Sequence, residues 1–222
     1  LLSMKLENPT LKKYADGIKS VAARSSEMTK KLLVLSKKQD LRHMWCDIHQ
    51  IIRDTIEILE HSIDRRIGIK HVLDAPAFMV SGDPVELQNI MLNLGLNARD
   101  AMENGGTLSY ETSVVKIGAD DNMNHLMDVV PGDYILVAVS DTGCGISEEV
   151  KSHLFEPFFT TKVEGKGTGL GLASVYATVK NHGGSINVYS EKGKGAVFRI
   201  YLPLGSGGID VQAQDGRESF SL

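Results

Sequence analysis

Two glycine clusters and the aromatic segment between them constrain this chain more than any other part of its sequence. The first cluster, residues 141–147 (Asp-Thr-Gly-Cys-Gly-Ile-Ser), begins with an acid that is separated from an apolar run by one serine. The aromatic segment at residues 155–162 follows, and the second cluster, residues 165–172, opens a largely apolar stretch. Glycines let the backbone approach a ligand closely, and backbone amides at a helix start bind anions. The order and spacing together indicate a nucleotide pocket, although each piece alone would be weak evidence.

The composition is that of a soluble globular protein with one main domain. The chain has 222 residues, of which 42% are hydrophobic and 23% charged, enough for one domain of roughly 150 residues and an accessory element. The net charge of −4 provides no basic surface for nucleic acid. The longest apolar run, residues 134–139, is too short to span a membrane, and the sequence shows no signal peptide.

Cysteine and histidine usage predicts neither a disulfide framework nor a metal cluster. The chain has two cysteines, Cys46 and Cys144, and its seven histidines lack the i, i+4 spacing of a helical metal pair. We therefore expect reduced thiols and a cytoplasmic location. The sequence begins at Leu1 rather than Met, which leaves open a longer, membrane-attached parent protein.

The N-terminal segment predicts one long helix over residues 9–38, capped by Asn8. Its seam positions alternate spacings of three and four and are interrupted once by a serine: Leu11, Tyr14, Ile18, Val21, Ser25, Met28, Leu32 and Leu35. A heptad seam of this length indicates pairing with another helix, and the sequence predicts no second helix of this kind. The alternative is an amphipathic helix that packs on the following domain.

Apolar periodicity, caps and turn residues predict the remaining elements. Helices are expected at residues 48–66, 84–103 and 169–181, and strands near residues 71–73, 77–80, 107–115, 134–140, 185–190 and 196–202. Residues 39–47 and 116–132 are expected to be connections, and residues 205–222 a linker or disordered tail.

The helix predicted at residues 84–103 has a polar stripe beside its apolar face. Asn93, Asn97, Asp100 and Asn104 recur at spacings of four, three and four, which places them on one side of the helix. Polar groups beside a core must meet water, a ligand or each other. Asn97 offers a neutral oxygen suited to a Mg²⁺ ion that is held mainly by phosphate. From the stripe alone, the alternative is the solvated edge of an amphipathic helix.

Asp141 is the residue that we expect to recognise a base. A carboxylate at the end of an apolar strand accepts a hydrogen bond from the exocyclic amino group of adenine. Gly143 and Gly145 let the backbone come close to that base. Taken alone, the sequence Asp-Thr-Gly is also typical of a hairpin turn.

The second glycine cluster is expected to bind phosphates. Glycines occupy every second position from residue 165 to residue 171, directly before an apolar helix whose first amides would form an anion site. Lys162 and Lys166 would meet phosphate as point charges. The phenylalanines at residues 155–159 are expected to anchor this segment in the core, and the glycines to let residues 160–168 move.

Together these motifs resemble the ATP-binding catalytic domain of sensor histidine kinases over about residues 41–204. The family has conserved motifs called the N box, two glycine boxes and the F box. The N box corresponds to residues 93–102, the first glycine box to residues 141–145, the F box to residues 155–159 and the second glycine box to residues 167–172. Residues 193–203 resemble the family's closing strand. Ala196 stands where the family often has Thr. The sequence that begins at Asn97 is most similar to hybrid and nitrogen-regulator-type kinases. The resemblance implies an α+β fold, a two-layer α/β sandwich of a mixed sheet under three helices, which binds ATP and Mg²⁺.

The resemblance also implies which residues form the site. Asn93 and Asn97 would be catalytic, and Asn97 would hold the metal. The cofactor-binding residues would be Asn97, Asp100, Asp141, Gly143, Gly145, Ile146, Phe159, Thr161, Lys162, Gly167, Thr168, Gly169, Leu170, Gly171 and Leu172. One position departs from the family, because many members have Lys where this chain has Asp100. Arg99, Lys162 and Lys166 are candidates for the cation that contacts phosphate instead.

The long N-terminal helix resembles the second helix of the family's dimerisation and phosphoacceptor hairpin. This assigns residues 1–40 to a partial hairpin, residues 41–204 to the catalytic domain and residues 205–222 to a linker or tail. The helix that carries the acceptor histidine would precede Leu1. The parent protein would form a homodimer through the hairpin and would pass its phosphate to a response regulator or receiver domain.

Two other functions fit parts of this sequence. An ATP-driven clamp of the Hsp90 and mismatch-repair type shares the fold but carries a Glu base at the position of Asn93, and an amide cannot take a proton from water. A non-catalytic module for nucleotide binding or dimerisation would not need the full set of motifs. The sequence therefore favours a histidine kinase core.

Overall fold

The computed structural model describes residues 10–19, 44–118, 129–162 and 167–205. Residues 10–19 are helical, as predicted, and three seam residues within them, Leu11, Tyr14 and Ile18, are 50%, 64% and 71% exposed. The rest of the predicted 9–38 helix and nearly all of the predicted tail lie outside the described residues.

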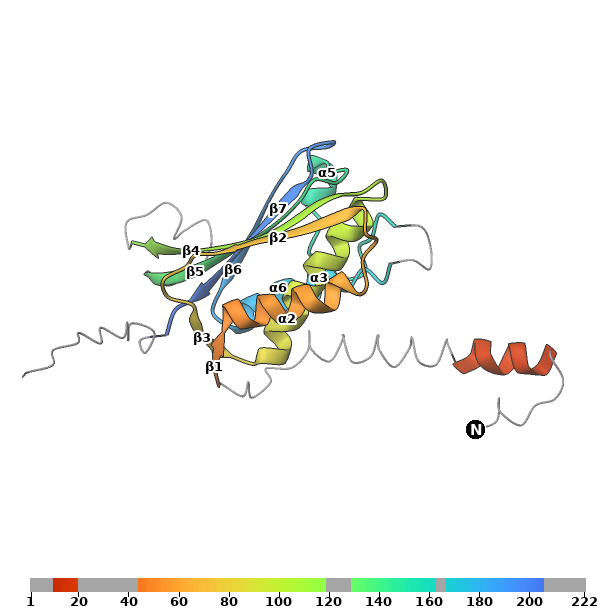
Figure 1. The fold of residues 1–222 in the computed structure, drawn as a ribbon, viewed down its shortest axis with the longest axis horizontal. Helices are drawn as coiled ribbons and strands as arrows, with labels where there is room; N and C mark the ends of the chain where they lie inside the picture. Colours follow the sequence, from red (N-terminus) through yellow and green to blue (C-terminus); the bar gives the residue numbers. More distant parts are fainter. Residues whose placement is uncertain (1–9, 20–43, 119–128, 163–166, 206–222) are drawn as a thin grey trace, which may run out of the picture.

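The centre of the fold is a mixed five-stranded sheet (Figure 1). Its strand order is β2-β4-β5-β7-β6, with β2 parallel to β4 and every other pair antiparallel. The strands are β2 (Ile67–Leu73), β4 (Gly106–Ile117), β5 (Gly132–Asp141), β6 (Ser185–Ser190) and β7 (Ala196–Pro203). The long antiparallel pair of β4 and β5 brings Asp141 to the end of a central strand.

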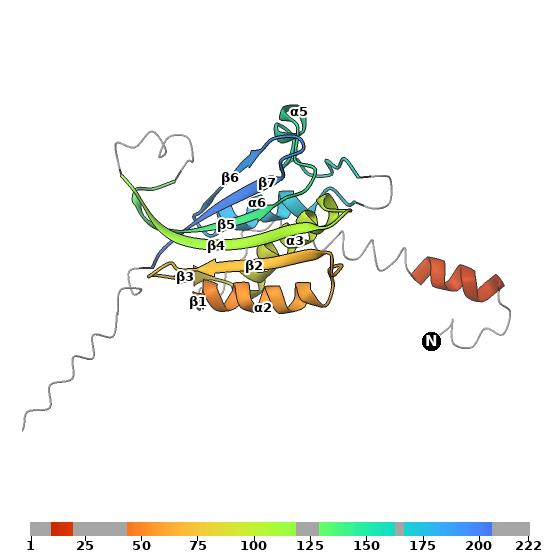
Figure 2. The same ribbon diagram turned by 45° about the horizontal axis from the view of Figure 1, so that its top comes forward.

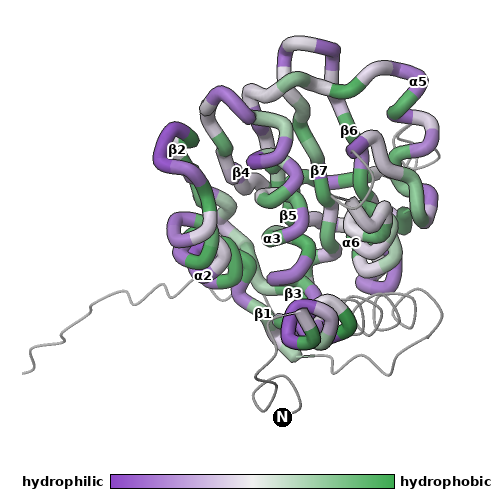
Figure 3. Tube along the Cα trace, turned by 90° about the vertical axis from the view of Figure 1, so that its right-hand side faces the viewer, coloured by the Kyte–Doolittle hydropathy of each residue, from purple (hydrophilic) through white to green (hydrophobic). Residues whose placement is uncertain are grey.

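Three helices cover one face of this sheet, which confirms the predicted two-layer sandwich (Figures 1 and 2). They are α2 (Ile48–Glu60), α3 (Pro84–Ala101) and α6 (Gly171–Asn181). Helix α3 lies between α2 and α6 and contacts both, and the apolar positions of the helices and strands gather between the two layers (Figure 3). A further short helix, α5 (Glu148–Lys151), was not predicted from the sequence.

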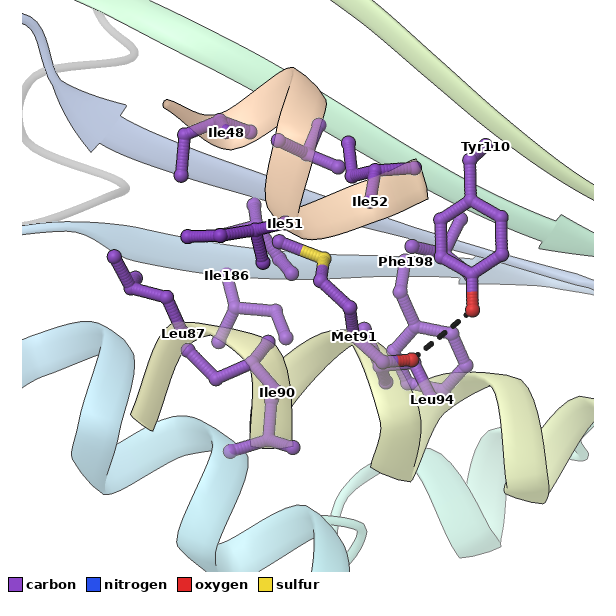
Figure 4. Close-up of a cluster of buried hydrophobic side chains, with 14 of the residues drawn as sticks. Ile48, Ile51, Ile52, Leu87, Ile90, Met91, Leu94, Tyr110, Ile186 and Phe198 are labelled. Atoms are coloured by element: carbon purple, nitrogen blue, oxygen red, sulfur yellow. Dashed lines mark hydrogen bonds between the residues drawn. The ribbon is translucent and has the colours of Figure 1, made fainter. Parts of the chain in front are cut away.

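The core lies between the helices and the sheet (Figure 4). Isoleucines of α2, apolar side chains of α3, and Ile186 and Phe198 from the strands fill it, and most are almost fully buried. Burial of this apolar surface stabilises the packing of both layers. Tyr110 of β4 is also completely buried, and its hydroxyl donates a hydrogen bond of 3.0 Å to the carbonyl of Met91 in α3. This bond satisfies the one polar atom that the tyrosine side chain brings into the core.

The N-terminal edge of the domain differs from the sequence prediction. Residues 39–47 were expected to be a connection, but β1 (Met44–Asp47) pairs antiparallel with β3 (Met79–Gly82). The predicted strand at residues 77–80 is therefore displaced by two residues. Because β1 has four residues and its partner follows more than thirty residues later, its local pattern does not reveal the pairing.

Helix α2 is shorter than predicted, since it ends at Glu60 rather than near Arg66. The Asp64 carboxylate accepts a hydrogen bond from the backbone nitrogen of Arg66 over 2.9 Å, which forms a turn in place of another helical turn. The chain then enters β2 at Ile67, earlier than the predicted strand start at residue 71. Helix α3 begins at Pro84 as predicted, with Asp83 accepting hydrogen bonds from the first-turn amides.

The described residues contain no cluster of three or more His, Cys, Asp or Glu side chains that could hold a metal ion. Within the same ranges, no helix is long and apolar enough to cross a bilayer. Both cysteines are free, with Cys46 buried and Cys144 exposed.

Candidate functional site

Asp141 ends β5 with its side chain held in a fixed position. The residue is 9% exposed, and its Oδ1 atom accepts a hydrogen bond of 2.8 Å from the backbone nitrogen of Gly143. Burial raises the pKa of the Asp141 carboxyl, while hydrogen bonds from the backbone amides of Gly143 and Ala196 lower it. The strand end therefore presents a buried, oriented carboxyl group of the kind that an adenine amino group requires.

The first glycine cluster packs tightly on the C-terminal end of α3. A Cβ atom on Gly143 would lie 2.5 Å from the carbonyl oxygen of Ala101, so no larger residue fits without a shift of backbone. The next amide, of Cys144, donates a hydrogen bond of 3.0 Å to the same oxygen. Gly145 has a φ of 68°, a conformation that L residues rarely adopt. The glycines thus form a narrow turn beside Asp141.

Sequence reasoning missed the polar residues that support this turn. The Ser190 hydroxyl accepts a hydrogen bond of 2.8 Å from the Ile146 amide and donates one of 2.6 Å to the Gly195 carbonyl. The Thr142 hydroxyl accepts a bond of 3.0 Å from the Thr107 amide. The glycine pair before β7 was the signal that could have located the Ser190 contact, because it marks a tight turn at the end of the neighbouring strand.

Three of the four residues of the predicted polar stripe lie on α3, and the fourth lies beyond the C-terminal end of the helix. Asn93, Asn97 and Asp100 are half-buried on α3, whereas Asn104 follows the helix end at Ala101 in an exposed turn. Met102 has φ and ψ values of −116° and 53°, which end the helix before Asn104. The stripe therefore consists of Asn93, Asn97 and Asp100.

Lys162 joins this stripe from the segment between α5 and α6. Its Nζ atom lies 3.3 Å from Oδ1 of Asn97 and 2.5 Å from Oδ2 of Asp100. Arg99 contacts the other oxygen of the Asp100 carboxylate, with its Nε atom at 2.8 Å. Burial raises the pKa of Asp100, but hydrogen bonds from Lys162 and Arg99 outweigh it, so the net pKa is lowered. Three predicted site residues, Asn97, Asp100 and Lys162, thus come together, while Lys166 lies outside the described residues.

The second glycine cluster leads into α6 without a side-chain cap. Helix α6 begins at Gly171, and its N-cap residue, the fully buried Leu170, makes no side-chain capping bond. A Cβ atom on Gly171 would be 3.7 Å from Oδ1 of Asn93, so the first turn of α6 lies next to the α3 stripe. Uncapped amides at a helix start suit a phosphate. Leu172 and Ile146 pack against the core, and Thr168 accepts a hydrogen bond from the Leu170 amide over 3.4 Å.

The F-box phenylalanines have different environments, which corrects the expectation that all three anchor the segment. Phe155 packs on the core and lies 5.3 Å from the Tyr176 ring. Phe159 lies 5.6 Å from the His153 ring. Phe158 is 52% exposed and has a φ of 71°. Its backbone amide donates a hydrogen bond of 2.9 Å to the carbonyl oxygen of Gly169. Thr161 is exposed, and residues 163–166 of the predicted moving segment 160–168 lie outside the described residues.

A small cavity of about 50 Å³ lies between α3 and α6, lined by Glu86, Asn93 and Thr178 among others. One carboxylate oxygen of Glu86, Oε2, is buried there without a hydrogen-bond partner among the described residues. Burial raises the pKa of this carboxyl group. The cavity has room for water rather than for a nucleotide.

Comparison with known families identifies this arrangement. Residues 82–206 match the family of histidine kinase-, DNA gyrase B- and HSP90-like ATPases. The chain belongs to this family. Membership implies that ATP is the nucleotide. The residues fit ATP, because they include a buried carboxyl group, a cradle that a Cβ atom would fill, uncapped helix amides and a lysine that contacts the polar stripe of α3.

Curated relatives of this ATPase domain are sensor kinases. Sensor kinase CckA of Brucella abortus is 39% identical over 187 residues, which cover 84% of this chain and 20% of CckA. Sensor histidine kinase ZraS of Salmonella typhimurium is 33% identical over 184 residues, which cover 82% of this chain and 36% of ZraS. The chain therefore spans about a fifth to about a third of the length of these relatives.

Solved histidine kinase structures share the fold. The catalytic domain of histidine kinase ThkA has 26% identity and a TM-score of 0.58, and the match covers 73% of this chain and 96% of that domain. ThkA in complex with the response regulator protein TrrA matches with 26% identity and a TM-score of 0.63, over 90% of this chain and 53% of that chain. The mixed sheet and its three helices are thus the family's fold.

Proposed function

We propose that this chain is the ATP-binding catalytic core of a two-component sensor histidine kinase. It would transfer the γ-phosphate of ATP to a histidine outside these 222 residues. The observation that carries the proposal is the chemistry of Asn93, which lies beside the start of α6 and offers an amide rather than a base. The similarity to sensor kinases over more than four-fifths of the chain supports it.

The base of ATP would be recognised by Asp141. Its carboxylate would accept the exocyclic amino group of adenine, and the Gly143 amide already fixes one carboxylate oxygen. Ile146 packs against the core next to this cradle and would provide an apolar contact for the base. A hydrogen bond to a charged group at a buried position contributes about 1.5–3 kcal/mol.

The phosphates would lie between α3 and the start of α6, with Mg²⁺ held by Asn97. The Asn97 side chain presents Oδ1 to this region, and a neutral amide oxygen is a ligand that Mg²⁺ accepts alongside phosphate oxygens and water. When bound, the metal would neutralise negative charge on the phosphates. The uncapped amides of α6 and the ammonium of Lys162 are the groups of this chain that would orient them.

Phosphoryl transfer to histidine needs no carboxylate base, whereas hydrolysis by a clamp ATPase does. A neutral imidazole nitrogen attacks with its own lone pair, but water must lose a proton. Asn93 cannot accept that proton. The acids on the same helix face, Glu86 and Asp100, each lie seven residues from Asn93, roughly 10 Å along the axis. The site therefore favours transfer to histidine over the clamp alternative.

Partners follow from the same proposal. The structure of ThkA with the response regulator protein TrrA supports a response regulator or receiver domain as the protein that receives the phosphate. The exposed apolar side chains of Leu11, Tyr14 and Ile18 support pairing of this helix in a homodimeric parent protein. An apolar stripe on an otherwise solvated helix gains stability when a second helix covers it.

The test uses ATP labelled in its γ-phosphate. A longer parent protein that includes the acceptor helix should become labelled, and the label should be lost in acid because phosphohistidine is acid-labile. The 222-residue chain alone should bind ATP but stay unlabelled, and it should label an acceptor hairpin supplied separately. Stoichiometric labelling of this chain alone on its own histidines would refute the proposal, as would rapid release of free phosphate without any labelled protein.

A further inference from the structure

The position of Asp100 poses an electrostatic problem for a phosphate site. The residue lies one turn after Asn97 on the same face of α3, so its carboxylate faces the region assigned to the phosphates. A carboxylate in that place would repel an anionic ligand. The structure places two cations on it, because Lys162 contacts Oδ2 and Arg99 contacts Oδ1. One negative and two positive charges leave this group with a net charge of +1.

We propose that Asp100 is a positioning residue that holds the ammonium of Lys162 at the phosphate site. In this arrangement Asp100 acts through Lys162 and does not itself contact the nucleotide. The inference rests on the proposed function, since it assigns a role at the same ATP site. It also answers which of the three candidate cations meets the phosphates: Lys162 does, and Arg99 holds the other side of the carboxylate.

The distances favour this assignment. Lys162 and Asp100 are 62 residues apart in sequence, yet their charged atoms are 2.5 Å apart. Their side chains are 35% and 29% exposed, so solvent screens the pair less than it screens a surface ion pair. A free lysine side chain loses rotamer entropy when it binds. By holding the ammonium in place beforehand, Asp100 lowers the entropy cost of a phosphate contact.

The contact between Asn97 and Lys162 provides a second reason why Asp100 would be needed to hold the Lys162 ammonium. The Lys162 ammonium donates to both Asn97 and Asp100, and Asn97 Oδ1 is the oxygen proposed for Mg²⁺. An ammonium and a metal ion on one oxygen repel each other because their charges have the same sign. The bond to Asp100 is compatible with a metal on Asn97 and would keep Lys162 within the site.

Calorimetric titration of the whole 222-residue chain with MgATP and with adenosine tests this role. Lys162→Met should weaken MgATP binding about tenfold or more and leave adenosine binding unchanged, because a charge-assisted hydrogen bond is lost. Asp100→Asn should weaken MgATP binding in the same direction. The double variant should bind MgATP about as tightly as Lys162→Met alone. Asp64→Asn, which alters an exposed Asp–Arg pair, is the matched control and should change neither affinity.

A second variant distinguishes positioning from a general structural role. Asp100→Lys puts a cation directly on α3, as many family members have it, so Lys162→Met should then cost less than about twofold in MgATP affinity. Tighter MgATP binding by Asp100→Asn would overturn the proposal, because the carboxylate would then merely repel phosphate. An equal cost of Lys162→Met in both backgrounds would also overturn it. Failure of the unmodified chain to bind either ligand would instead refute the proposed ATP site, and this inference with it.

Discussion

The carboxylate of Asp141 and the amide of Gly143 form a closed turn, with 2.8 Å between Oδ1 and the backbone nitrogen. The turn packs closely against α3, since a Cβ atom added to Gly143 would overlap the carbonyl of Ala101. Strand β5, the glycine turn and the end of α3 are therefore one packed unit. Any change in this unit should affect both the Asp141 carboxylate, which we propose recognises the base, and the helix that carries the polar stripe.

Replacement of Asp141 by Asn should weaken adenosine binding by about 1.5–3 kcal/mol, because a neutral amide replaces a charged acceptor. The substitution keeps the size of the side chain and an oxygen that can accept from the Gly143 amide. Isothermal titration with adenosine measures the effect, and thermal unfolding of the variant checks that the turn persists. An unchanged affinity would exclude Asp141 from base recognition.

The pH dependence of adenosine binding should follow the same carboxyl group. Burial raises the pKa of Asp141 above its ordinary value of 3.8, so the group takes up a proton at a less acidic pH than an exposed aspartate does. Adenosine affinity should fall as the pH decreases through this raised pKa. The contribution of Asp141 to the free energy of unfolding of the ligand-free protein should instead increase as the pH decreases, because a raised native pKa favours folding at low pH. Titrations at several acidic pH values should show this dependence in the unmodified chain but not in Asp141→Asn.

Asn97→Ala should remove most of the dependence of ATP affinity on Mg²⁺ while adenosine affinity stays nearly unchanged. The amide oxygen is the metal ligand proposed on α3, and adenosine carries no phosphate to share a metal ion. Titration with ATP in the presence of Mg²⁺ or of a chelator measures the difference. If adenosine and ATP affinities fall equally, Asn97 supports the fold rather than the metal.

Gly143→Ala should lower the free energy of unfolding by about 1–3 kcal/mol, because the added methyl group overlaps the backbone of Ala101. Gly132→Ala is the matched control, since its Cβ atom would lie an ordinary 3.8 Å from the Tyr134 ring. Urea unfolding of both variants provides the comparison. Equal stability of the two variants would show that the turn relaxes without cost.

His49 should make the fold less stable in acid. The ring is buried against Phe78, with 4.6 Å between ring centroids, and its Nε2 atom lies 2.9 Å from the Thr112 hydroxyl. Burial lowers the pKa of His49 below 6.5, and Arg53 lowers it further against the opposing effects of Asp47 and Asp74.

The unfolded state therefore binds the His49 proton more readily than the native state does. Stability is fully present above pH 6.5 and is lost as the pH falls from 6.5 through the lower native pKa. Urea unfolding at pH 7.5 and at pH 5 should show a larger loss for the unmodified chain than for His49→Gln. His153→Gln, at an exposed histidine, should keep the full loss.

Local chemistry made much of the fold predictable. Asp83 and Pro84 define the start of α3, and strand β6 has the predicted bounds, because caps and alternation act between residues that are close in sequence. The pairing of β1 with β3 was not predicted, since it depends on a partner far along the chain. The sequence prediction placed the end of α2 about six residues too late, because the apolar helical pattern continues past the point where the Asp64 turn ends the helix.

The sequence by itself determined the protein family and the motifs that mark it. These are an acid followed by glycines, a polar stripe on a helix and a second glycine cluster before another helix. These motifs are readable because each needs only neighbouring residues to form its part of a pocket. Only the tertiary structure decided how the parts meet. The contact of Lys162 with Asn97 and Asp100 depends on side-chain reach and on the packing of α3 against α6, and no local pattern encodes the distance between residues that are 65 and 62 positions apart.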